Sequence, residues 1–98
     1  MAEWSLLVFR DLGFSPEEAE HLRIRSVLIV HLRRLIEARG LNQSEAAKLF
    51  GVTQPRVSDL VQGKIGLFSI DALIDMLARA GVRVKLTLSS SRRKLRVA

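Results

Sequence analysis

The stretch LNQSEAAKLFGVTQPRVSDLVQGK, residues 41–64, decides the fold because it contains two short helical segments and the turn between them. Apolar residues recur at helical spacing on both sides of Gly51. This spacing predicts one helix over about Gln43–Phe50 and a second over about Thr53–Gln62. Each segment is expected to end at a glycine, the first at Gly51 and the second at Gly63.

The two segments are expected to cross steeply. Ala47 lies four residues before Gly51, and its small side chain allows the second helix to pack closely against the first. Gly51 permits the positive φ that a tight turn requires. Val52, Val57 and Leu60 then form the inner face of the second helix. The polar residues left pointing outwards or to the sides are Gln54, Arg56, Ser58 and Asp59. A helix presented in this way fits a DNA major groove.

Proline at position 55 does not interrupt the second helix. Backbone amides in a first helical turn have no intrahelical partner, so Pro55 loses no hydrogen bond there. Two registers remain open. Either Thr53 caps the helix and Pro55 is second in it, or Gln54 is the cap and Pro55 is first, because proline disfavours α geometry in the residue before it. The register determines whether Gln54 reads a base edge or only holds the helix end.

The flanking segments predict longer elements. Ser15, Pro16 and Glu18 form a helix-start signal with a capping box, and the helix that follows is expected to run to Arg39. Another helix is expected to begin after a cap at Ser69 and to end near Gly81. Beyond it apolar and polar residues alternate over Val82–Leu88, which is typical of a half-buried strand.

The expected fold is therefore all-α, with four or five helices around the two short ones and a C-terminal β-strand. The long helix is apolar on more than one side, and a single strand is not stable alone. A homodimer formed through Val82–Leu88, Pro16–Arg39 or both is expected for these reasons. The predicted divisions are a packing arm (1–14), a helical domain (15–81), a strand (82–89) and a basic flexible tail (90–98).

Charge is distributed unevenly along the 98 residues. Residues 1–20 contain one base and five acids, a net charge of −4, whereas residues 21–98 contain fifteen bases and five acids, a net charge of +10. A basic body suggests a polyanionic partner, although a solvated charged surface explains the same composition. The chain has no cysteine, which fits a reducing cytoplasm, and it has no run of apolar residues long enough to cross a membrane.

The 41–64 stretch resembles the helix-turn-helix of the Cro/repressor-like, or XRE-type, DNA-binding family, which has a lambda-repressor-like fold. The segments VFRDLGF, LIEARGLNQSEAAKLFGV and FSIDALIDMLARAGVRVKL are also similar to the HigA-like antitoxin branch of that family. The similarity covers about residues 8–88. The helix-turn-helix is its specific part, because the flanking segments consist of common residue types.

The resemblance implies a set of DNA-contacting positions. Asn42 and Gln43 stand where the family meets DNA phosphate, and Gln54 stands at the first groove-facing position, where glutamine pairs with adenine. Lys64 matches a backbone contact at the helix end. Asp59 either accepts a hydrogen bond from cytosine or forms an ion pair with Arg56 or with another basic residue. The full set of candidate DNA-binding residues is Asn42, Gln43, Ser44, Thr53, Gln54, Pro55, Arg56, Ser58, Asp59 and Lys64.

Plainer explanations exist for several of these residues. Gln43 could only cap its helix, Asn42 could only start a turn, and Arg56 with Asp59 could be a surface ion pair. No set of residues for catalysis, a cofactor or a phosphate loop is present, and His21 and His31 do not share a helix face, so neither an enzyme nor a metal site is expected.

The expected function is a sequence-specific transcriptional repressor that binds double-stranded operator DNA as a homodimer. The resemblance further implies an antitoxin that binds a small ribonuclease toxin and represses its own operon. The alternatives are a stand-alone XRE-type regulator without a toxin partner and a protein-interaction module that uses the same helices.

Overall fold

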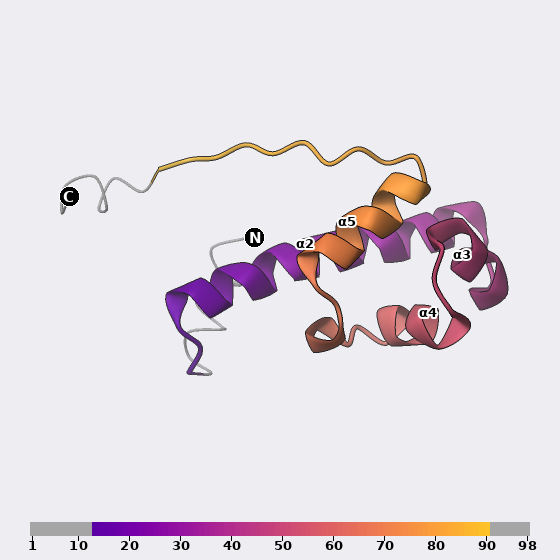
Figure 1. The fold of residues 1–98 in the computed structure, drawn as a ribbon, viewed down its shortest axis with the longest axis horizontal. Helices are drawn as coiled ribbons and strands as arrows, with labels where there is room; N and C mark the ends of the chain where they lie inside the picture. Colours follow the sequence, from indigo (N-terminus) through magenta and orange to yellow (C-terminus); the bar gives the residue numbers. More distant parts are fainter. Residues whose placement is uncertain (1–12, 91–98) are drawn as a thin grey trace.

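The computed structural model describes residues 13–90, and within them four α-helices and one short 3-10 turn follow one another without a sheet (Figure 1). The helices are α2 (Pro16–Arg39), α3 (Gln43–Phe50), α4 (Gln54–Val61) and α5 (Ile70–Arg79), and the turn η1 (Ile65–Leu67) follows α4. The all-α prediction is confirmed for this part of the chain. The predicted helix bounds agree with the observed ones to within a residue or two.

The long helix α2 supports the other elements. Its C-terminal half contacts α4, η1 and α5, while its N-terminal half extends beyond them (Figure 1). The helix begins with the predicted capping box, in which the Ser15 hydroxyl accepts the Glu18 N–H at 3.1 Å and Glu18 Oε1 accepts the Ser15 N–H at 3.0 Å. These two bonds satisfy amides that the first turn leaves without an intrahelical partner.

The capping box makes the stability of α2 sensitive to acid. The hydrogen bond from the Ser15 backbone lowers the pKa of Glu18 below its ordinary value of 4.5. The stabilisation is therefore present above that ordinary value and is lost as pH falls through the lowered pKa of the folded state. Because glutamine completes a capping box without titrating, the melting temperature of Glu18→Gln should fall less than that of the wild type between neutral pH and pH about 3. An equal fall in melting temperature for the two proteins over this pH range would contradict this expectation.

One hydrophobic core joins the C-terminal half of α2 to the three shorter helices. Every helix contributes apolar side chains to it, and no polar or charged residue is buried among the described residues. Ile29 of α2 is buried in this core, so it is not one of the apolar residues of the helix that are available to a partner. The buried members are Leu28, Ile29, Leu32, Ala46, Ala47, Phe50, Val57, Leu60, Phe68, Leu73, Met76, Leu77 and Ala80.

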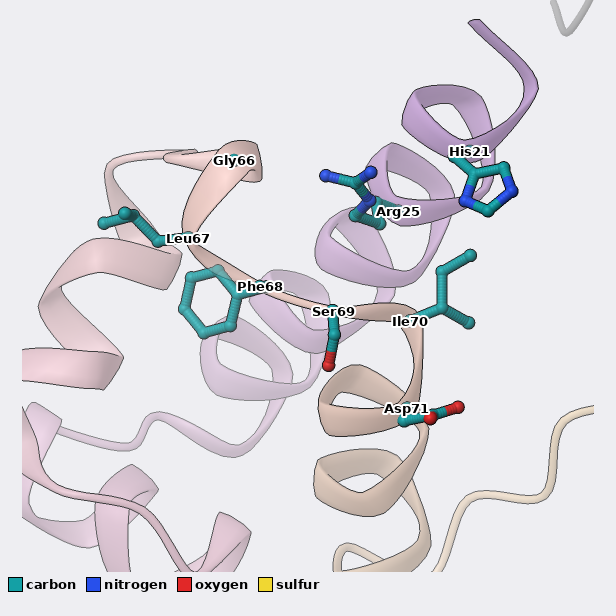
Figure 2. Close-up of a pocket in the computed structure, with 8 residues that line it drawn as sticks. All are labelled: His21, Arg25, Gly66, Leu67, Phe68, Ser69, Ile70 and Asp71. Carbon is teal, nitrogen blue, oxygen red and sulfur yellow. The ribbon is translucent and has the colours of Figure 1, made fainter. Parts of the chain in front are cut away.

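Helix α5 is fixed at both of its ends. The Ser69 hydroxyl accepts the Ala72 N–H at 3.1 Å, which confirms the predicted cap. Phe68 immediately precedes this cap (Figure 2) and is buried in the core together with Leu73, in the arrangement of a hydrophobic staple. At the other end of α5, the Val82 N–H donates to the Leu77 carbonyl at 2.9 Å, closing the Schellman motif that Gly81 predicts.

The predicted C-terminal strand stays a prediction. Residues 82–90 run as an extended segment after α5 (Figure 1), but they pair with no other strand in the described part of the chain. Val82 and Val84 pack against the core, whereas Leu86 and Leu88 are 81% and 93% exposed. A strand requires backbone partners on a neighbouring strand, and none is provided by residues 13–81.

Two predicted segments lie wholly or mostly outside the described residues. These are the N-terminal packing arm, of which only Gly13 and Phe14 are described, and the basic tail, of which only Ser90 is described.

Candidate nucleic-acid interface

The turn between α3 and α4 has the geometry that its sequence predicts. Gly51 ends α3 with φ of 70°, and the Val52 N–H donates to the Ala47 carbonyl at 3.0 Å. Ala47 is buried where α3 meets α4. On α4, Val57 and Leu60 have no solvent exposure at all. The inner face of α4 is therefore packed against the core, whereas residues 13–90 leave its outer face open to a partner.

The structure settles the register of Pro55. Thr53 is the N-cap with extended backbone, Gln54 is the first helical residue and Pro55 is the second. The Thr53 carbonyl accepts the N–H groups of Arg56 and Val57 at 3.1 and 3.2 Å, but its side chain makes no capping hydrogen bond. Gln54 is exposed and is not the cap. Its amide is therefore free to face a ligand, as the first of the two predicted registers requires.

Asp59 pairs with Lys64 and not with Arg56. Asp59 Oδ1 lies 3.5 Å from Lys64 Nζ, which connects the outer face of α4 to the loop that follows it. Of the alternatives for Asp59, an ion pair with a basic residue other than Arg56 is therefore the one observed. Ser58 lies beside it on the helix, and its hydroxyl accepts a hydrogen bond from the Gln62 amide at 3.2 Å.

Arg56 lies at the edge of α4 rather than at the centre of its outer face. Arg56 is half-buried, whereas its neighbours Gln54 and Pro55 are exposed. Its guanidinium carbon stacks 4.4 Å from the centre of the Phe68 ring. This cation–π contact holds the charged group beside the loop between α4 and α5.

The start of α3 is capped by Asn42. Its Oδ1 accepts the Glu45 N–H at 2.8 Å, and its own N–H donates to Glu45 Oε1 at 2.9 Å. The suggestion that Gln43 caps this helix is wrong, because Gln43 is its first helical residue. Gln43 is exposed and Ser44 is half-buried. The spacing N-x-x-E signals this capping box in the sequence, but the prediction did not use it.

A family model described as a helix-turn-helix domain matches residues 8–89, most of the chain. The chain belongs to the helix-turn-helix domain family. Among curated proteins, none is similar enough to the chain to be counted as a relative. The helix-turn-helix domain therefore suggests a DNA-binding regulator, with α3 as the first helix of the motif and α4 as the second.

Three arginines of the helix-turn-helix domain lie at the C-terminal ends of other helices. The Arg79 side chain packs over Gly51 at the end of α3, where an added Cβ would lie 2.6 Å from its Nε. Arg33 lies beside Gly63 at the end of α4, and Arg39 donates to the Ala80 carbonyl at 3.3 Å. Cations stabilise the negative end of a helix dipole. Part of the basic charge therefore has a structural role, which composition alone does not reveal.

The remaining charged and polar groups form no metal site. Within residues 13–90 no three histidine or acidic side chains lie close enough together to hold a metal ion. His21 and Arg25 lie one turn apart on α2 and line an open depression with the segment 66–71 (Figure 2). No helix in the described part of the chain is both long and apolar enough to span a membrane.

Proposed function

We propose that this protein is a sequence-specific transcriptional repressor that inserts α4 into the major groove of operator DNA. One observation carries the proposal: α4 is anchored by Val57 and Leu60, which are completely buried, while Gln54 and Pro55 at its N-terminal end are exposed. A short helix with a packed inner face and a free N-terminal end is the form in which helix-turn-helix proteins present side chains to base edges.

The charge distribution supports the proposal. Lys64 offsets the charge of Asp59, so the acid on α4 is a smaller obstacle to an approaching phosphate than its sequence position suggests. Gln43 and Ser44 lie at the N-terminal end of α3, where backbone amides and the helix dipole favour an anion. The basic body adds sequence-independent attraction for DNA.

The decisive experiment is a fluorescence-polarisation titration of the full chain with DNA from upstream of its own gene. We expect salt-dependent binding that is tighter than binding to an unrelated duplex of equal length. Lys64→Ala should weaken binding to both duplexes alike. It should also make the negative slope of log Kobs against log [salt] shallower by about 0.9, because one phosphate contact is lost. Absence of salt-dependent binding by the wild type would reject the DNA-binding function.

A homodimer is part of the proposal. The side of α2 that faces away from the core exposes Val27 and Val30, at 47% and 40%. An apolar groove next to this side is lined by residues of α2 together with Leu77 and Val82. With the exposed Leu86 and Leu88, these residues give a second chain an apolar surface away from the α4 outer face. Two α4 helices would then meet half-sites about 34–36 Å apart.

Charge introduced into this surface tests the dimer. We expect the double variant Leu86→Glu/Leu88→Glu to elute as a monomer, with the mass measured by light scattering, while the wild type elutes as a dimer. The substituted side chains are almost fully exposed in the single chain, so its helical content should not change. A monomeric wild type at micromolar concentration, or a variant with unchanged mass, would count against this interface.

The antitoxin role is proposed on the resemblance to HigA-like proteins. The partner would be a small ribonuclease toxin encoded next to this gene, and the protein would act in the cytoplasm. Co-expression tests the role: the protein should co-purify with the neighbouring gene product and inhibit its ribonuclease activity. If DNA binding is found without either effect, the stand-alone regulator is the better description. If neither DNA binding nor toxin binding is found, the protein-interaction module remains.

A further inference from the structure

Arg33 of α2 lies close to the C-terminal end of α4, the helix proposed to enter the major groove. Its Nη1 lies 4.0 Å from the position that a Cβ would occupy on Gly63, the residue that ends α4 with φ of 73°. Lys64 follows directly. The packing of α2 against α4 and η1 therefore places Arg33, which is distant in sequence, at the same end of α4 as Lys64.

The charges at this end of α4 give Arg33 a particular importance. Lys64 Nζ and Asp59 Oδ1 are 3.5 Å apart and together carry no net charge. Arg33 adds the single positive charge that remains among these three residues. Its side chain is exposed, and it makes no hydrogen bond or ion pair with the described part of the chain. Arg39, in contrast, already donates to the Ala80 carbonyl.

We propose that Arg33 binds the DNA backbone and forms, with Lys64, a two-point phosphate clamp at the C-terminal end of α4. The proposal rests on the proposed DNA-binding function and extends the contact surface from the helix-turn-helix onto α2. A guanidinium offers a planar pair of donors that matches phosphate oxygens. Such a contact positions the protein on the duplex without reading sequence.

A purely structural role for Arg33 predicts different results. A cation beside the last turn of α4 stabilises the helix dipole, as Arg79 is placed to do for α3. Loss of that effect would lower thermal stability but would release no additional counterions from DNA. The salt dependence of binding therefore distinguishes the two roles.

The experiment compares Arg33→Ala with Lys48→Ala in the full chain. Lys48 is also exposed and lies in the last turn of α3, and it belongs neither to the candidate DNA contacts nor to the proposed dimer surface. Each substitution removes one positive charge from the surface. Each variant is titrated by fluorescence polarisation with the upstream duplex and with an unrelated duplex over a range of salt concentrations. Circular dichroism establishes that each variant is folded at the titration temperature.

We expect Arg33→Ala to make the negative salt slope shallower by about 0.9 on both duplexes, as Lys64→Ala does, while Lys48→Ala leaves the slope at the wild-type value. The inference is overturned if Arg33→Ala keeps the wild-type slope while Lys64→Ala makes it shallower. This holds whether or not the melting temperature of Arg33→Ala falls. It is also overturned if the Arg33 and Lys48 variants make the slope shallower by equal amounts. A wild type that binds neither duplex rejects the underlying DNA-binding function instead.

Discussion

Replacing Phe68 with alanine is expected to lower the free energy of unfolding by about 3–5 kcal/mol. The Phe68 side chain is 2% exposed and packs in the core that joins α2 to the three shorter helices. The substitution leaves a cavity there, removes the staple partner of Leu73 and removes the ring on which Arg56 stacks. Because a domain of this size is stable by roughly 5–15 kcal/mol, this loss removes a large fraction of its total stability. Urea titration monitored by circular dichroism measures the change.

Phe68→Leu is the matched control for this prediction. Leucine retains most of the buried volume and should cost less than about 1.5 kcal/mol, but it provides no aromatic face for Arg56. A double-mutant cycle with Arg56→Ala should then give a coupling of about 0.5–1 kcal/mol, the typical value for a cation–π contact near the surface. A loss below about 1 kcal/mol for Phe68→Ala would show that Phe68 does not support the core.

Gln54→Ala is expected to reduce the preference for operator DNA over unrelated DNA by about 10- to 100-fold. Gln54 is exposed at the first position of α4, where a glutamine amide can form two hydrogen bonds with adenine, and such a pair contributes about 1–3 kcal/mol of discrimination. Affinity for unrelated DNA should change little, because that affinity comes from phosphate contacts. Competition titrations with the upstream duplex and an unrelated duplex provide the ratio.

Gln43→Ala serves as the comparison, because it is the same substitution at the start of the other short helix. Gln43 is exposed at the first position of α3, where a phosphate contact is proposed. Its loss should weaken binding to both duplexes by a similar factor and leave their ratio unchanged. An unchanged ratio for Gln54→Ala, or a changed ratio for Gln43→Ala, would mean that base reading is assigned to the wrong residue.

Much of the local structure was predictable because its causes lie within a few residues along the chain. The capping boxes and the glycine stops depend on side chains and amides three to six residues apart, so Ser15, Glu18 and Gly51 indicate helix ends directly. The Asn42–Glu45 box belongs to the same class, because its two hydrogen bonds join residues three positions apart. The register of Pro55 lay at the limit, since two local preferences opposed each other there.

The candidate site was only partly predictable, because its electrostatics depend on contacts between elements. Arg56 and Asp59 lie three residues apart on one helix, which favours an ion pair between them, yet Arg56 stacks on Phe68 and Asp59 pairs with Lys64. The folding of the loop between α4 and α5 against α4 makes these partners available. Sequence spacing contains no information about that approach.

Local sequence patterns predict where the helices begin and end, which of their faces are apolar and that α3 and α4 meet at a glycine turn. These properties follow from helical periodicity and from capping rules that act within about one turn. Which charges meet depends on the tertiary structure. It places Arg79 over Gly51 and Arg33 beside Gly63, and within residues 13–90 it provides no strand partner for residues 82–90. The physical reason is that such contacts depend on how the helices cross, and the crossing is set by the packing of the whole core.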